Sequence, residues 1–202
     1  LLNNIREMPI TMRKLGLVQF FSWFAFFSMW SLATPALTDH VFNSPKPNKI
    51  QFSIANELEK TNYQVADKAY NDAADQVGAY MGYYGLSSML FALALTFYTS
   101  RNRINRKLLH IFSLLAGAIG FLSMYLINDP RFLLFSFVLI GLSWGSILSM
   151  PYAMLSSFID SNKMGLSMGI FNMFIVIPQI LAAKALNPIY SILGKEAIYA
   201  MI

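Results

Sequence analysis

Cysteine is absent from this 202-residue chain, and only 12% of its residues are charged. The absence of cysteine excludes a disulfide-stabilised scaffold. The charged fraction is about half of the roughly 25% that is typical of soluble domains, so the composition does not suit a water-soluble fold. Disordered chains are poor in hydrophobic residues, whereas 56% of this sequence is hydrophobic. The composition therefore indicates a membrane protein.

Motifs for catalysis and cofactor binding are also absent from the sequence. There is no glycine-rich phosphate-binding loop ending in Lys-Ser or Lys-Thr, which argues against a nucleotide site. There is no His or Cys spacing suited to a metal, and no nucleophile with a base in the apolar stretches. We therefore expect no metal, no cofactor and no enzymatic activity.

Five apolar stretches reach about 20 residues, the length that a helix needs to cross a bilayer. They lie near residues 15–38, 77–100, 108–128, 132–155 and 164–186. A sixth begins near residue 197 and stops at Ile202, so we expect the chain to be part of a longer protein. The predicted fold class is all-α, with residues 15–202 forming a polytopic transmembrane helix bundle.

The chain has a net charge of +5, and its cations and carboxylates gather on opposite sides of the predicted bundle. The cations on one side are Arg6, Arg13, Lys14, Arg101, Arg103, Arg106, Lys107 and Lys163. The other side holds the segment 39–76, which contains most of the carboxylates. The positive-inside rule then makes residues 1–14 a cytoplasmic linker and residues 39–76 an outer loop. The basic excess reflects membrane topology, and we expect no nucleic-acid partner.

The outer loop is expected to be mostly a solvated connector, with an external gate or cap as the alternative. Its second part, residues 50–75, is rich in Ala, Glu, Lys and Gln, which favour helix. Because this outer segment lacks cysteine, we expect a multi-pass protein of the inner (plasma) membrane of a bacterium.

Polar and aromatic side chains fall on single faces of two predicted spans. Gln19, Trp23 and Trp30 are spaced i, i+4 and i+11, which places them together on a helix. Indole rings stack on the apolar faces of sugars and a carboxamide binds two hydroxyls, although tryptophan also collects at membrane boundaries. Asn172 and Gln179, at i and i+7, are costly in lipid and should face a cavity or a partner helix.

Small and helix-breaking residues mark the fourth and fifth spans. Gly141 and Gly145 have the spacing that permits close helix approach, and Gly169 repeats it with Gly165. Pro151 and Pro178 each free a backbone carbonyl. We predict that Gly145, Pro151, Gly169 and Pro178 allow bending during gating. A packing interface is the alternative for the fourth span. At the end of the first span, Asp39 and His40 suggest a helix terminus or a proton relay.

Three stretches of the sequence carry a family resemblance: LVQFFSWFAFF at 17–27, SMPYAMLS at 149–156 and KMGLSMGIFNMFIVIPQ at 163–179. They resemble the C-terminal half of sugar:proton symporters of the major facilitator superfamily, in the sucrose and maltose branch close to the glycoside–pentoside–hexuronide symporters. The resemblance implies that the five spans correspond to helices seven to eleven of a twelve-helix fold. Substrate would bind between two six-helix halves near the midplane.

The resemblance adds further site residues. Tyr84 matches a family aromatic, although Gly85 stands where Asn is common. Arg106 and Lys107 match a basic loop that locks the cytoplasmic side, although Asn105 replaces the usual Gly.

The expected function is proton-coupled uptake of a disaccharide or small oligosaccharide by alternating access. The expected partners are the sugar, the proton, the lipid bilayer and an N-terminal half that supplies the proton acceptor. The alternatives are a carrier for a different solute and a membrane scaffold or sensor that retains the fold.

Overall fold

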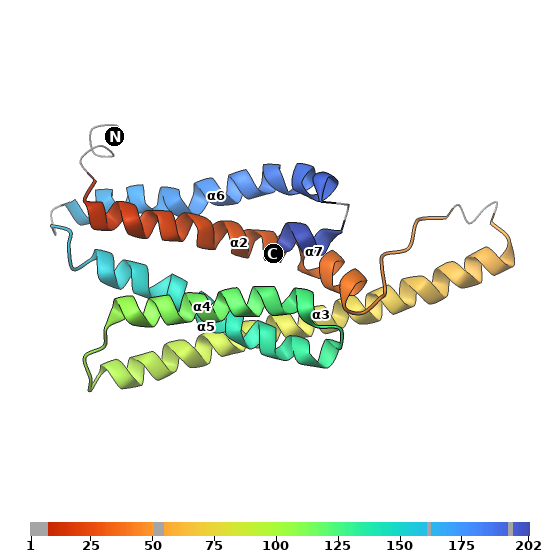
Figure 1. Cartoon of the computed structure of the whole chain (residues 1–202), viewed down its shortest axis with the longest axis horizontal. Coiled ribbons are helices and arrows are strands. Elements are labelled where there is room, and N and C mark those ends of the chain that lie inside the picture. The colour runs from red at the N-terminus through yellow and green to blue at the C-terminus, as the bar shows by residue number, and fades with distance from the viewer. Residues whose placement is uncertain (1–7, 51–54, 161–162, 194–195) are drawn as a thin grey trace.

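The computed structural model describes residues 8–50, 55–160, 163–193 and 196–202, and within these ranges every regular element is a helix. In chain order the elements are α2 (Ile10–His40), α3 (Glu57–Thr99), α4 (Arg106–Leu126), η1 (Pro130–Phe132), α5 (Leu133–Leu155), α6 (Met164–Ile192) and α7 (Ala197–Met201). Helix α6 lies along α2, and α4 packs with α5 beside the second half of α3 (Figure 1). The predicted all-α bundle is confirmed, while residues 1–7 of the predicted linker, including Arg6, lie outside the described residues.

Four helical segments of the described chain are long and apolar enough to cross a membrane. They are Ile10–His40, Arg106–Leu126, Pro130–Leu155 and Met164–Ile192. Helix α3 is not among them, because its first half is polar and its second half mixes Gly, Tyr and Ser with the apolar residues. The span near 77–100 therefore stays a prediction.

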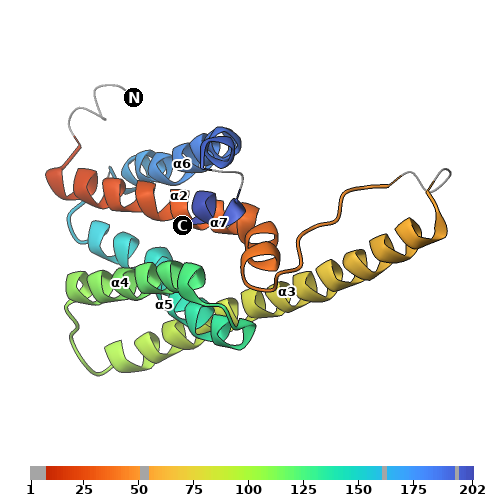
Figure 2. The same cartoon turned by 45° about the vertical axis from the view of Figure 1, so that its right-hand side comes forward.

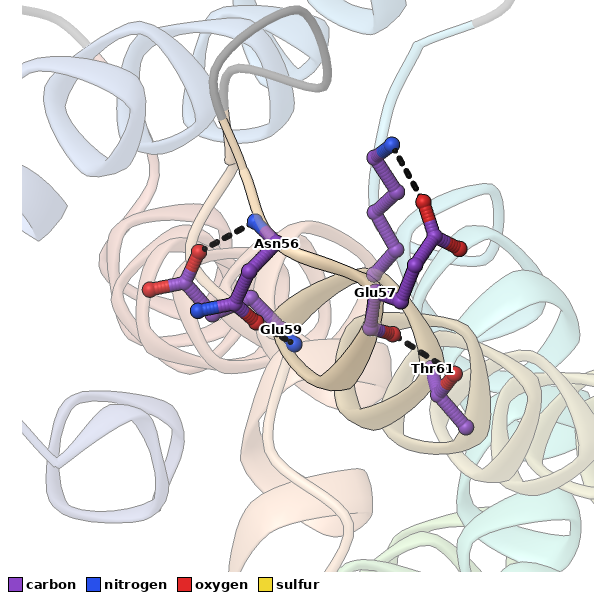
Figure 3. Close-up of polar contacts among 5 residues, drawn as sticks. Asn56, Glu57, Glu59 and Thr61 are labelled. Carbon is purple, nitrogen blue, oxygen red and sulfur yellow. Dashed lines mark hydrogen bonds and ion pairs between the residues drawn. The ribbon is translucent and has the colours of Figure 1, made fainter.

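Helix α3 has 43 residues, about 65 Å at 1.5 Å per residue, and its first half projects beyond the bundle (Figures 1 and 2). At its start, the Asn56 side chain accepts from the Glu59 amide at 2.8 Å, and the Glu59 carboxylate accepts from the Asn56 amide at 2.9 Å (Figure 3). This reciprocal cap satisfies two amide groups that the first turn leaves without helical partners. The helix expected within 50–75 is therefore present from Glu57 and runs unbroken into the bundle.

Helix α5 packs closely on α3 through its glycines. A Cβ added at Gly145 would lie 2.8 Å from Phe91 and 3.1 Å from the Ser88 carbonyl, and one added at Gly141 would collide with the Tyr84 carbonyl. Only hydrogen fits at these positions, so the two backbones approach closely. This close approach supports the packing-interface alternative for the fourth span.

The α4–α5 contact combines small residues with buried hydrogen bonds. A Cβ added at Gly117 of α4 would lie 2.5 Å from the Cβ of Ser143. His110 Nδ1 lies 2.8 Å from the Ser146 hydroxyl, and His110 is only 4% exposed. Each such bond satisfies a polar group that is costly to leave alone in a bilayer.

Helix α2 is held at both of its ends. Near its start, Gly16 faces the ring of Phe174 on α6, from which an added Cβ would be 2.8 Å away. At its other end, His40 Nε2 lies 2.9 Å from the Tyr125 carbonyl and the two rings stack with centroids 5.3 Å apart. This contact supports the helix-terminus interpretation of His40.

The surroundings of Gly141 and Gly169 predict that alanine at these two positions changes the stability of the protein by different amounts. Gly141→Ala should lower the free energy of unfolding by about 1–3 kcal/mol, because the added methyl group forces α3 and α5 apart. Gly169→Ala is the matched control, because nothing lies within 4 Å of a Cβ placed there. Thermal unfolding of the purified variants in detergent measures both effects. Equal midpoints for the two variants would contradict the close contact of α3 and α5.

Candidate functional site

Six rings from four helices form the aromatic cluster, and Trp144 of α5 lies at its centre. Its members are Trp23, Phe26, Trp30, Tyr84, Phe121 and Trp144. The Trp144 centroid is 5.1 Å from those of both Trp23 and Trp30, edge to face in each case, and 4.9 Å from that of Phe26. Edge-to-face contacts at this separation are the favoured geometry for aromatic rings.

The aromatic cluster has a buried and an accessible side. Phe26 is 2% exposed and meets Phe121 edge to face at 5.7 Å, whereas Trp30 is 36% exposed. Tyr84 of α3 lies 6.4 Å from both Phe26 and Trp144. The structure therefore brings together three of the predicted binding residues, Trp23, Trp30 and Tyr84.

Sequence reasoning missed Trp144 and Phe121. Trp144 stands between Ser143 and Gly145 in a run of small residues, and that run is interpreted from the sequence only as a site of bending or a packing interface. A large indole in the middle of such a run was a usable signal. Phe121 is one of 17 phenylalanines and nothing in the sequence distinguishes it.

Gln19 is fully buried and reaches across to α5. Its Nε2 donates to the Ile147 carbonyl at 3.4 Å. Four residues later stands Pro151, which has no N–H, so this carbonyl lacks its partner within α5. The α2 side chain thus supplies a donor to a carbonyl that the proline leaves open, and two separately predicted residues belong to one contact.

Two polar atoms on this face of α2 are buried and have no hydrogen-bond partner. They are Gln19 Oε1, an acceptor, and Trp23 Nε1, a donor. The two residues are one helical turn apart, so their side chains leave α2 on the same face. A single hydroxyl group can donate to the first atom and accept from the second.

The predicted residues on α6 are separate from the aromatic cluster in the described contacts. Asn172 Oδ1 accepts from the Tyr152 hydroxyl of α5 at 2.7 Å, so this amide meets a partner helix. Gln179 is half-buried beside the buried Pro178. A role for Asn172 and Gln179 in binding solute stays a prediction.

A family model described as Major Facilitator Superfamily matches residues 2–183. The chain belongs to the major facilitator superfamily. Members of this superfamily are transporters rather than enzymes, and the chain is accordingly part of a multi-pass membrane transporter. The observed helices form part of the superfamily's bundle. No curated protein shows a significant match to the chain.

The residues predicted to gate this major facilitator bundle occupy different surroundings. Gly145 lies in the α3–α5 contact, whereas Gly169 faces open space. Arg106, at the start of α4, donates from Nη1 to the Ala153 carbonyl at 2.7 Å, near the end of α5. A cation suits that position because the last carbonyls of a helix carry partial negative charge. Lys107 beside it is exposed.

The contact of Gln19 with α5 predicts an energetic coupling to Pro151. Gln19→Leu should cost about 1–3 kcal/mol of unfolding free energy, because it leaves a buried carbonyl without a donor. In a Pro151→Ala background the same change should cost less, because the alanine restores a backbone N–H that donates to the Ile147 carbonyl within the helix.

A double-mutant cycle measured by denaturant unfolding in detergent tests this coupling. Gln179→Leu serves as the control, since it removes a carboxamide that is only half-buried. Equal costs of Gln19→Leu in the two backgrounds would contradict the assignment.

Proposed function

We propose that the chain is the C-terminal bundle of a proton-coupled symporter for a disaccharide or small oligosaccharide. It would work with an N-terminal six-helix half by alternating access, with the solute held between the halves. The observation that carries the proposal is the aromatic cluster, which lies beside a buried donor and acceptor without partners.

The chemistry of these groups suits a sugar better than other solutes. A sugar ring has an apolar face that stacks on indole and hydroxyls that both donate and accept. Trp30 and Tyr84 offer the stacking surfaces, while Gln19 Oε1 and Trp23 Nε1 are complementary to one hydroxyl. A purely apolar solute would leave both polar atoms unsatisfied, and an ion would find no charged side chain in the aromatic cluster.

The proton acceptor is assigned to the other half of the transporter. The acids of this sequence are confined to the ends of the spans and to the loops, and α2 contains a carboxylate only at Asp39, one residue from its end. A carboxylate inside the membrane is the usual means of coupling to protons. We therefore propose that this chain binds the sugar and the missing half takes up the proton.

Bending at the inner end of α5 is proposed to contribute to the change of access. Pro151 removes one hydrogen bond from the helix ladder, which lowers the cost of bending there. The Gln19 contact with Ile147 and the Arg106 contact with Ala153 lie on either side of this proline. Alternating access would exchange these contacts as one half rocks against the other.

Uptake measurements on the complete transporter test the proposal. In proteoliposomes with an imposed pH gradient, labelled maltose or sucrose should accumulate, and an uncoupler should abolish the accumulation. Trp30→Ala should lower uptake about tenfold, the loss expected when stacking of the sugar worth about 1.4 kcal/mol is removed. Phe132→Ala, an exposed ring outside the aromatic cluster, is the control and should transport normally.

The role of Asn172 is tested in the same assay. Asn172→Ala should lower sugar uptake sharply, whereas Tyr152→Phe, which removes only the hydroxyl that Asn172 accepts from, should lower it less. Equal losses of uptake in the two variants would indicate that Asn172 only contacts helix α5 and does not bind the sugar. Accumulation of a peptide or nucleoside but of no sugar would favour a different carrier, and absence of transport of any solute would favour a scaffold or sensor.

A further inference from the structure

A cleft lies at the end of the bundle predicted to be cytoplasmic, between the ends of α3 and α5. It has a volume of about 610 Å³. Its lining includes Thr96 of α3, Met150 of α5, Arg103 and Ile104 of the α3–α4 connection, and Arg106 at the start of α4. None of these residues belongs to the aromatic cluster, so the cleft is distinct from the proposed sugar site.

The charged side chains that line this cleft are Arg103 and Arg106, and both are cations. The connection from α3 to α4 carries Arg101 and Arg103, α4 begins with Arg106 and Lys107, and no acid lies between Asp75 and Asp129 in the sequence. In the described part of the chain, Lys60 pairs with Glu57 and Arg131 with Asp129, and neither ion pair involves these four cations. An uncompensated cluster of this kind attracts anions.

The arginines supply the charged hydrogen-bond donors of the cleft. The hydroxyls of Thr96 and Ser149 donate to the carbonyls of their own helices, at 2.9 and 2.7 Å, and have no further proton to give. Arg106 uses one donor on the Ala153 carbonyl, which holds the guanidinium in place while other N–H groups remain. Guanidinium groups match the oxygen geometry of phosphate.

Apolar surface next to the arginines favours a lipid over a soluble anion. Ile104 and Met150 line the cleft itself. On the neighbouring helices Phe97 is 73% exposed, Leu108 50% and Leu148 47%. A ligand with a phosphate and attached acyl chains would use both the charged and the apolar parts of this surface.

We propose that this cleft binds the phosphate headgroup of an anionic phospholipid from the cytoplasmic leaflet, with Arg103 and Arg106 as the phosphate ligands. The site depends on the membrane placement of the chain and not on the transported solute. Basic sites at the cytoplasmic face gain attraction from the anionic lipids enriched there.

Native mass spectrometry of the purified protein in neutral detergent tests the proposal. The probes are phosphatidylglycerol, phosphatidylcholine and sodium phosphate, each titrated separately. Phosphatidylglycerol should bind saturably and more tightly than both other probes. Arg103→Gln should weaken its binding about fivefold, and Arg103→Gln with Arg106→Gln about thirtyfold, the factors expected for about 1 kcal/mol per cation.

The control pair is Lys49→Gln with Lys68→Gln, which removes the same charge from exposed positions on the outer segment. It should bind phosphatidylglycerol as the parent does. If the double arginine variant fails to fold, Arg103→Gln still decides the test, because it leaves the Arg106–Ala153 bond intact. Equal affinity for the two lipids, unchanged binding by Arg103→Gln, or sodium phosphate binding as tightly as the lipid would each overturn the proposal. Lipid binding is measured without transport, so its failure is separate from failure of the sugar proposal.

Discussion

Helices in a bilayer gain little from burying apolar surface against one another, because the lipid tails are equally apolar. Their association depends instead on close contact and on hydrogen bonds between polar groups. In this chain both are concentrated on α5, whose glycines admit α3 and whose serines bond to α4. The Ser87 hydroxyl of α3 also donates to the Val138 carbonyl of α5 at 2.8 Å. The positions of α3 and α4 therefore follow from the small residues of α5, whereas α6 packs along α2.

The same helix positions the candidate site. Trp144 stands within the run of small residues on α5. The close approach of α3 to this run therefore brings Tyr84 toward the indole. One turn further along, the carbonyl of Ile147 receives Gln19 from α2, because Pro151 cannot supply an N–H. Packing and the proposed solute site thus share one element, and bending of α5 would change both together. This coupling is what an alternating-access transporter requires.

Much of the architecture was predictable because span length and charge distribution are properties of the chain itself. The all-helical bundle was predictable in this way, and the structure places Trp23, Trp30 and Tyr84, which were predicted separately as binding residues, in one cluster. Contacts between helices were harder to predict, because spacing along one helix does not specify the register of the next. The pairing of Gln19 with Ile147 and the central position of Trp144 therefore emerged only from the fold. Gly169 has the spacing of a helix contact but no neighbour within 4 Å of an added Cβ, so its role in bending stays a prediction.

Intrinsic fluorescence tests most directly whether the transported sugar binds at the aromatic cluster, as we propose. All three tryptophans of this chain, Trp23, Trp30 and Trp144, belong to the aromatic cluster. Titration of the purified protein with maltose or sucrose should give a saturable change in tryptophan emission, and a sugar that is not transported should give none. Unchanged emission at sugar concentrations that saturate uptake would contradict the account.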